Sequence, residues 1–224
     1  MTVCKIGIIA GMGAAAGARF YCDLITKCQS MGARKDSDFP EIFLHNMNST
    51  GMDETGIVDP DTVKNDLMWS VRLLEGLGAE VIAIACNSVH VYYRYLQNHA
   101  TAKILNMVEI AAESVIPANK VGVICSRSSK EYGLYKNSPV FAAAKTKIIE
   151  TTEAQQLVVD GVIGRAIAGI GTVQDITDIG QIAASMKKSG AANVILGCTE
   201  LPLVGHIPGC VNAGDMLINS LVAL

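Results

Sequence analysis

The chain has 224 residues, of which 50% are apolar and 17% charged, and its formal net charge is −3 at pH 7. So much apolar content is typical of a folded globular chain, and the absence of a basic stripe argues against nucleic acid as a partner. Aromatic residues make up only 5%. The abundance of Ala, Ile, Val and Gly favours parallel strands covered by helices over a sandwich or a coiled coil.

Hydropathy and cysteine content indicate the compartment in which we expect the protein. No apolar run reaches the ~18 residues that a transmembrane helix requires, so we expect no membrane partner. The N-terminal stretch MTVCKIGIIAGMG breaks at glycines and has no cleavage site, which argues against a signal peptide. The seven cysteines include no CxxC pair. We therefore expect free thiols in a reducing cytoplasm, without a disulfide framework or a metal site.

The first half of the chain alternates short apolar strands with helical patterns. Asp59 and Pro60 form a favourable helix start, with Asp as the N-cap and Pro at the first helical position. The elements expected in chain order are strand 5–10, helix 14–30, strand 41–45, helix 60–77, strand 81–85 and strand 103–107.

The second half repeats this alternation. Its expected elements are strand 120–125, helix 130–145, strand 146–150, helix 153–168, helix 175–188, strand 193–197 and helix 213–223. Strands that alternate with helices predict parallel sheets joined by right-handed crossovers.

Three matched segments indicate an internal duplication. LGAEVIAIAC resembles SGAANVILGC, and in both segments a glycine (Gly78, Gly190) ends a helix before a buried strand. KIGIIA at 5–10 matches KVGVIC at 120–125, and ILNMVE matches CVNAGD in the same order. The interpretation is a repeat of roughly 110 residues. We expect an α/β protein with two pseudo-symmetric three-layer lobes and a site in the cleft between them. One lobe comprises residues 1–100 plus 212–224, and the other comprises 101–211.

Cys86 and Cys198 end the two matched strands. In open parallel sheets, ligands bind beyond the carboxyl ends of strands, where free N–H groups favour a nearby anion. We therefore expect a lowered pKa for each thiol. If the lobes face each other, one thiolate can remove a proton from a carbon while the opposing thiol returns one to the other face, without a cofactor. The alternative for each cysteine is ordinary packing at a strand end.

GIIAGMG, ACNSVH and LGCTELP resemble three signatures of the aspartate/glutamate racemase family, and the resemblance covers nearly the whole chain. It implies that Cys86 and Cys198 are the catalytic acid/bases and that the protein is a homodimer. Around the substrate it places Met12, Asn87, Ser88, Ser129, Thr199 and Glu200. It also implies that the C-terminal helix packs back on the first lobe.

The carboxylate-binding residues of that family are not matched here. Members that act on aspartate often carry an Arg where this chain has Met52 or Asp53, and a family Lys falls near Ile167. Arg127, in the loop after strand 120–125, is the replacement cation that we expect.

The resulting hypothesis is a cofactor-independent racemase that inverts the α-carbon of a small amino acid, aspartate or glutamate. Two alternatives are a binding homologue with impaired catalysis and a one-thiol lyase or isomerase of the same fold. Two local patterns offer further alternatives. GMGAAAG, with Gly11, Gly13 and Gly17, resembles a loose nucleotide-binding loop. His90 follows Cys86 by one helical turn, as in a Cys–His pair for acyl transfer.

Overall fold

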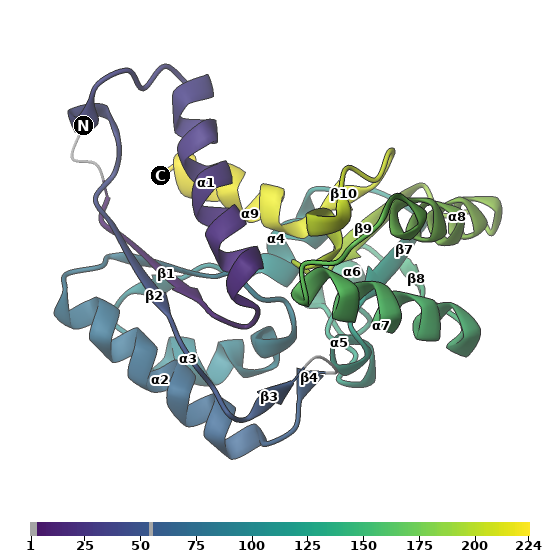
Figure 1. Ribbon diagram of the computed structural model, residues 1–224, viewed down its shortest axis with the longest axis horizontal. Coiled ribbons are helices and arrows are strands. Elements are labelled where there is room, and N and C mark those ends of the chain that lie inside the picture. Colours follow the sequence, from purple (N-terminus) through teal and green to yellow (C-terminus); the bar gives the residue numbers. More distant parts are fainter. Residues whose placement is uncertain (1–3, 54–55) are drawn as a thin grey trace.

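Two four-stranded parallel sheets form the framework of the protein (Figure 1). The computed structural model describes residues 4–53 and 56–224, so residues 1–3 and 54–55 of the expected first lobe lie outside it. The first sheet has the spatial order β2 (Ile42–Asn46), β1 (Ile6–Ala10), β5 (Val81–Ile84) and β6 (Lys103–Ile104). The second has the order β10 (Val211–Asn212), β9 (Asn193–Gly197), β7 (Lys120–Cys125) and β8 (Lys147–Ile149).

The two sheets have the same topology, which confirms the predicted duplication. Read from its other edge, the second sheet is β8-β7-β9-β10, and this order corresponds to β2-β1-β5-β6 of the first. The pairings within both sheets are parallel. β1 and β5 are buried along their whole length, as expected for strands covered on both faces.

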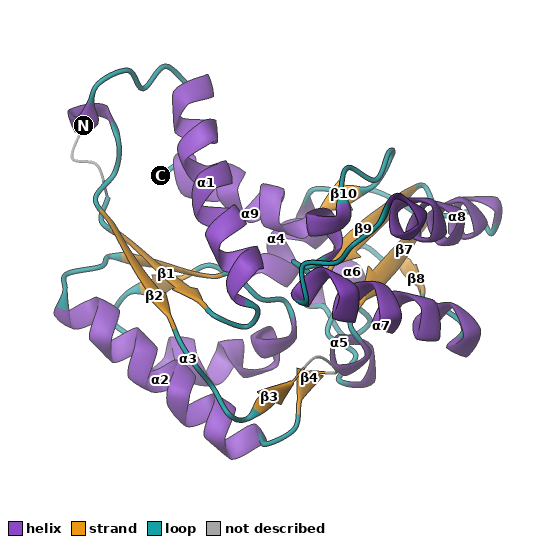
Figure 2. Cartoon of the chain, viewed as in Figure 1, coloured by secondary structure: helices purple, strands orange, loops and turns teal. Residues whose placement is uncertain are grey.

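Helices form three layers around the sheets (Figure 2). Between the sheets lie α1 (Ala14–Ser30), α4 (Met107–Glu113) and α9 (Ala213–Val222). The first sheet is covered on its other face by α2 (Pro60–Gly76) and α3 (Tyr93–His99). The second is covered by α7 (Glu153–Ile167) and α8 (Val173–Lys188). Among the described residues, no helix combines the length and apolar character needed to cross a lipid bilayer.

The remaining elements are short. Two helices, α5 (Arg127–Glu131) and α6 (Pro139–Ala143), follow β7, and an antiparallel hairpin is formed by β3 (Met52–Asp53) and β4 (Gly56–Ile57). Three 3₁₀ turns are η1 (Asp36–Asp38), η2 (Ser88–Tyr92) and η3 (Leu201–Val204). The hairpin reaches the second lobe, where the Ile57 N–H donates to Ser128 Oγ over 3.4 Å.

Helix ends follow the duplicated sequence. Gly78 and Gly190 have φ values of +92° and +95°, which L side chains rarely adopt, so both glycines end their helices as predicted. Asn106 and Asn212 cap α4 and α9, because each side chain accepts backbone N–H groups of the first turn. The expected strand 103–107 is consequently shorter, and α4 begins where the strand was predicted to continue.

One predicted helix is wrong. The segment 130–145 contains the last two residues of α5 and then, after a turn, α6, instead of one helix. Gly133 in that turn has φ +62°, and Pro139 starts the second helix. Proline lacks the N–H that a continuous helix needs at that position, so the chain breaks and restarts.

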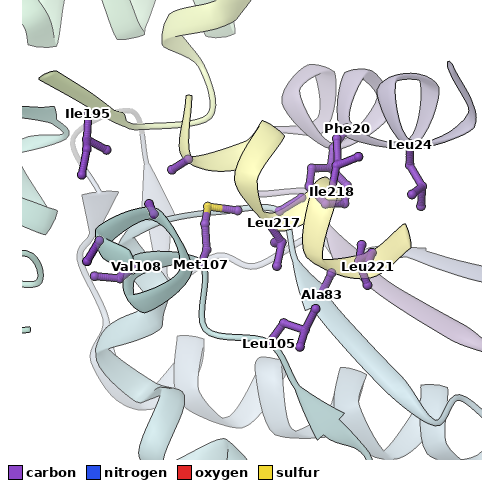
Figure 3. Close-up of a cluster of buried hydrophobic side chains, with 14 of the residues drawn as sticks. Phe20, Leu24, Ala83, Leu105, Met107, Val108, Ile195, Leu217, Ile218 and Leu221 are labelled. Carbon is purple, nitrogen blue, oxygen red and sulfur yellow. The ribbon is translucent and has the colours of Figure 1, made fainter. Parts of the chain in front are cut away.

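A single apolar cluster joins the two lobes. It contains Ile8 of β1, Val123 of β7, Met107 of α4 and Leu217 of α9, all buried. Figure 3 shows Leu217, Ile218 and Leu221 of α9 beside Phe20 of α1 and Met107 of α4. The C-terminal helix therefore packs back on the first lobe and also contacts α4, its equivalent in the duplication.

Leu217→Ala should lower the free energy of unfolding by about 2–5 kcal/mol, because Leu217 is fully buried and its truncation leaves a cavity. Urea unfolding followed by circular dichroism measures this change. Leu157→Ala is the matched control: its side chain is 63% exposed, and we expect a change within about 0.5 kcal/mol. Equal stability of the two variants would show that docking of α9 does not hold the lobes together.

Candidate active site

Cys86 and Cys198 occupy equivalent places in the two lobes. Cys86 lies two residues beyond β5, and Cys198 directly follows β9. Both are at least 95% buried, at 4% and 5% exposure, and both line one cavity of about 290 Å³. That volume is near the lower end for small-molecule sites, about 300–1,000 Å³, and suits a free amino acid.

The cavity lies between the lobes, since both lobes supply its walls. From the first half of the chain come Gly11, Met12, Gly13, Ser49, Met52, Asp53, Gly56, Cys86 and Ser88. From the second half come Ser126, Ile163, Ile167, Cys198 and Glu200.

Glu200 connects the second thiol to the first lobe. The Cys198 thiol donates to Glu200 Oε2 over 3.0 Å, and the Thr199 hydroxyl donates to the same oxygen over 3.2 Å. The other oxygen, Oε1, accepts the Gly13 N–H over 3.1 Å. The glycine loop after β1 thus binds a carboxylate of the other lobe, which gives it a role other than nucleotide binding.

Both thiols are protonated at neutral pH. Burial raises the pKa of Cys86 to about 12, and the charge of Glu200 adds to the increase. Burial, followed by the charge of Glu200 and its hydrogen bond, raises the pKa of Cys198 well above its ordinary value. The predicted lowering is therefore wrong in direction. The N–H groups of Ser88 and Val89 do favour the Cys86 thiolate, as expected, but burial outweighs them.

Three serines from the two lobes form a hydrogen-bonded cluster beside Cys86. Ser88 Oγ lies 2.8 Å from Ser126 Oγ and 3.2 Å from Ser129 Oγ. Ser126 also donates to Ser129 over 2.9 Å and accepts the Ser129 N–H as the N-cap of α5. The cluster is buried and joins the end of β5 to the end of β7.

Asn87 holds a buried donor next to these serines. Its Oδ1 accepts the Tyr135 hydroxyl over 2.6 Å, and among the described residues its Nδ2 has no hydrogen-bond partner. Tyr135 reaches this position because Gly197 has no Cβ, which would lie 2.6 Å from the Tyr135 ring. An unpaired buried amide is costly in a folded protein.

Some of the expected site residues line the cavity, and others lie in the network around it. Met12, Ser88 and Glu200 line it together with the two thiols. Asn87, Ser129 and Thr199 do not line it but lie in the hydrogen-bond network around it.

Arg127 lies outside the cavity, so its expected role as the carboxylate-binding cation is not supported. Its guanidinium pairs with Glu153 and Asp160 of α7, each at 2.8 Å. The side chain is drawn toward these two acidic partners and away from the thiols.

His90 does not form the alternative Cys–His pair. Its Nδ1 lies 2.8 Å from the backbone oxygen of Cys86 instead of the thiol, and burial lowers the pKa of the imidazole. In the described part of the chain, no group of three or more His, Cys, Asp or Glu residues is arranged to hold a metal ion.

Several cavity residues were not identified from the sequence. Ser126 follows β7, the strand equivalent to β1, so the rule that ligands bind at strand ends could have found it. Ile163 and the anchoring residue Tyr135 are placed by tertiary packing alone, and nothing in the local sequence indicates their proximity to the thiols.

Comparison with known proteins finds one matching family model and a related amino-acid racemase. The model of the Asp/Glu/Hydantoin racemase family matches residues 9–215. The broad specificity amino-acid racemase RacX of Bacillus subtilis (strain 168) is 27% identical over 201 residues, which cover 89% of this chain and 86% of that protein.

Solved structures share the two-lobed fold. Picrophilus torridus aspartate racemase has a TM-score of 0.79 at 20% identity, covering 98% of this chain and 93% of that one. An aspartate racemase homologue from Pyrococcus horikoshii OT3 has a TM-score of 0.77 at 19% identity, with coverage of 100% and 98%. At these identities the likeness shows the fold alone, and it confirms the predicted fold class.

Glu200→Gln should shift the alkylation of Cys86 and Cys198 by iodoacetamide to lower pH. Glutamine keeps an acceptor for the Gly13 N–H but removes the negative charge that helps to raise both thiol pKa values, so more thiolate is present at a given pH. Mass spectrometry of the labelled peptides reports each cysteine separately. Glu153→Gln, on the Arg127 pair, is the control and should leave both profiles in place. An unchanged profile in the Glu200 variant would show that its charge does not act on the thiols.

Proposed function

The chain belongs to the Asp/Glu/Hydantoin racemase family, and we propose that it racemises a free amino acid without a cofactor, with Cys86 and Cys198 as the two acid/bases. One observation carries the proposal: two thiols from equivalent strands of opposite lobes line the same cavity. Inversion of a stereocentre needs proton removal on one face and proton delivery on the other, and a pair of groups from two facing lobes suits both steps.

The reaction starts from two neutral thiols. Glu200 accepts the Cys198 proton along the existing 3.0 Å hydrogen bond, which leaves a thiolate. The thiolate removes the α-proton, and the electron pair of the C–H bond moves into the substrate carboxylate. Cys86 then donates its proton to the opposite face of the carbon. The products are the other enantiomer, a Cys198 thiol, a Cys86 thiolate and a protonated Glu200. The Cys86 thiolate is the base of the reverse reaction. For another forward turnover it takes up a proton while Glu200 releases the one it accepted, which restores the two neutral thiols.

We assign binding of the substrate carboxylate to Ser88, which lines the cavity next to Cys86. The Asn87 Nδ2, a buried donor without a partner in the described part of the chain, lies in the network around the cavity and not in its lining. Negative charge develops on this carboxylate as the α-proton leaves, so preorganised donors lower the barrier. Tyr135 positions Asn87 by donating to its Oδ1.

The relatives' names span aspartate, glutamate and broad specificity. Names with such a range do not select one side chain, so the class of substrate depends on the cavity of this chain.

Cys86→Ser and Cys198→Ser should each lower the rate of inversion by about 10²–10⁴-fold, because a hydroxyl is a far weaker acid than a thiol and each group serves one face of the carbon. Chiral chromatography of each amino acid after incubation with the protein measures the rate. Cys22→Ser, at an exposed cysteine outside the cavity, is the matched control.

Two outcomes would instead favour the alternative functions. Full activity in one of the two variants would indicate a one-thiol enzyme. A wild-type protein whose melting temperature rises with an amino acid that it does not invert would indicate a binding homologue.

A further inference from the structure

The described residues that line the cavity with the two thiols carry negative charge and no positive charge. Its charged lining residues are Asp53 and Glu200, and none of the described residues that line it is Lys, Arg or His. A site that selects a second carboxylate would need a cation or several donors facing that group, because buried charges are stable only when they are paired.

The arginines of the adjoining elements are bound elsewhere. Arg127 of α5 is held by Glu153 and Asp160. Arg165 lies on α7 between two cavity residues, but its Nε donates over 3.0 Å to Asp175 of α8, which is almost fully buried. Releasing either arginine into the cavity would leave carboxylates without their partners, and in the Arg165 case a buried one.

A side-chain carboxylate would meet repulsion here. Glu200 is buried, at 5% exposure, and its charge acts on both thiols across the cavity. A carboxylate placed in the same space would lose its hydration without a compensating cation and would face the like charge of Glu200.

The walls suit an aliphatic chain. Met12, Met52, Ile163 and Ile167 line the cavity, and Ile163 and Ile167 lie one turn apart on the same face of α7. Methionine side chains adapt to the shape of an apolar ligand. Asp53, on β3, adds a carboxylate to this wall, and its Oδ1 accepts the Gly56 N–H over 3.2 Å.

From this arrangement we propose that the substrates are non-acidic amino acids with an extended aliphatic side chain, and that Asp53 binds a cationic end of such a chain. The inference rests on the proposed racemase function and assigns its substrate class. Lysine and ornithine represent the cationic members, and norleucine represents the neutral ones. Aspartate and glutamate are excluded by charge rather than by size.

Two matched pairs of amino acids test the proposal with wild-type protein. Glutamine and glutamate differ in charge at nearly constant shape, and kcat/KM for glutamine should exceed that for glutamate by at least about 10²-fold, since an unpaired polar group is rejected strongly. Lysine and norleucine differ by the terminal ammonium, and the ratio of their kcat/KM values reports recognition of that charge.

Asp53→Asn should reduce the lysine-to-norleucine ratio by roughly 2- to 5-fold, the range for an exposed ion pair. Asp61→Asn removes the same charge from the surface of α2, at a side chain that is 88% exposed and outside the cavity. This control should keep the wild-type ratio.

Each outcome has a distinct meaning. Glutamate inverted as fast as glutamine would overturn the substrate class while the racemase function stands. An unchanged lysine-to-norleucine ratio in the Asp53 variant would overturn the role of Asp53. Absence of α-hydrogen exchange in D₂O with every amino acid, acidic ones included, would overturn the racemase function itself.

Discussion

The packing of α9 against α4 and α1 fixes how the two halves of the molecule face each other, and the site depends on it. α4 and α9 are equivalent helices of the duplicated unit, so their contact lies where the two halves meet (Figure 3). β5 and β9 end beside the same cavity as a consequence, and each carries its thiol there. An apolar contact between helices therefore determines which two sulfur atoms line the same cavity.

Burial is the second constraint on the site. It keeps both thiols protonated by raising their pKa values, and Glu200 strengthens the effect. The same carboxylate accepts a hydrogen bond from the Cys198 thiol and, through the Gly13 N–H, connects the lobes. Glu200 thus combines three roles: it favours neutral thiols, it offers a destination for one proton, and it holds the glycine loop against the second lobe.

Local signals made much of this architecture predictable from the sequence. Gly78 and Gly190 end their helices because only glycine readily adopts that backbone conformation, and Cys86 and Cys198 follow from the repeated strand pattern. The structure contradicts the predictions where tertiary contacts determine the position or the pKa of a side chain. Arg127 is turned toward α7 by acidic residues more than twenty positions later, and the thiol pKa values rise because the loop N–H groups cannot offset burial. Neither effect is encoded near the residue it changes.

The isotope pattern of the first turnovers tests the two-thiol account most directly. In D₂O, each enantiomer is incubated separately and the α-deuterium content of both enantiomers is followed before equilibrium. Two opposing thiols predict deuterium in the newly formed enantiomer while the remaining substrate stays largely protiated, in both directions, because the acid that delivers the proton is not the base that removed it. Deuterium that enters substrate and product equally from the outset would indicate a single base and would contradict the account.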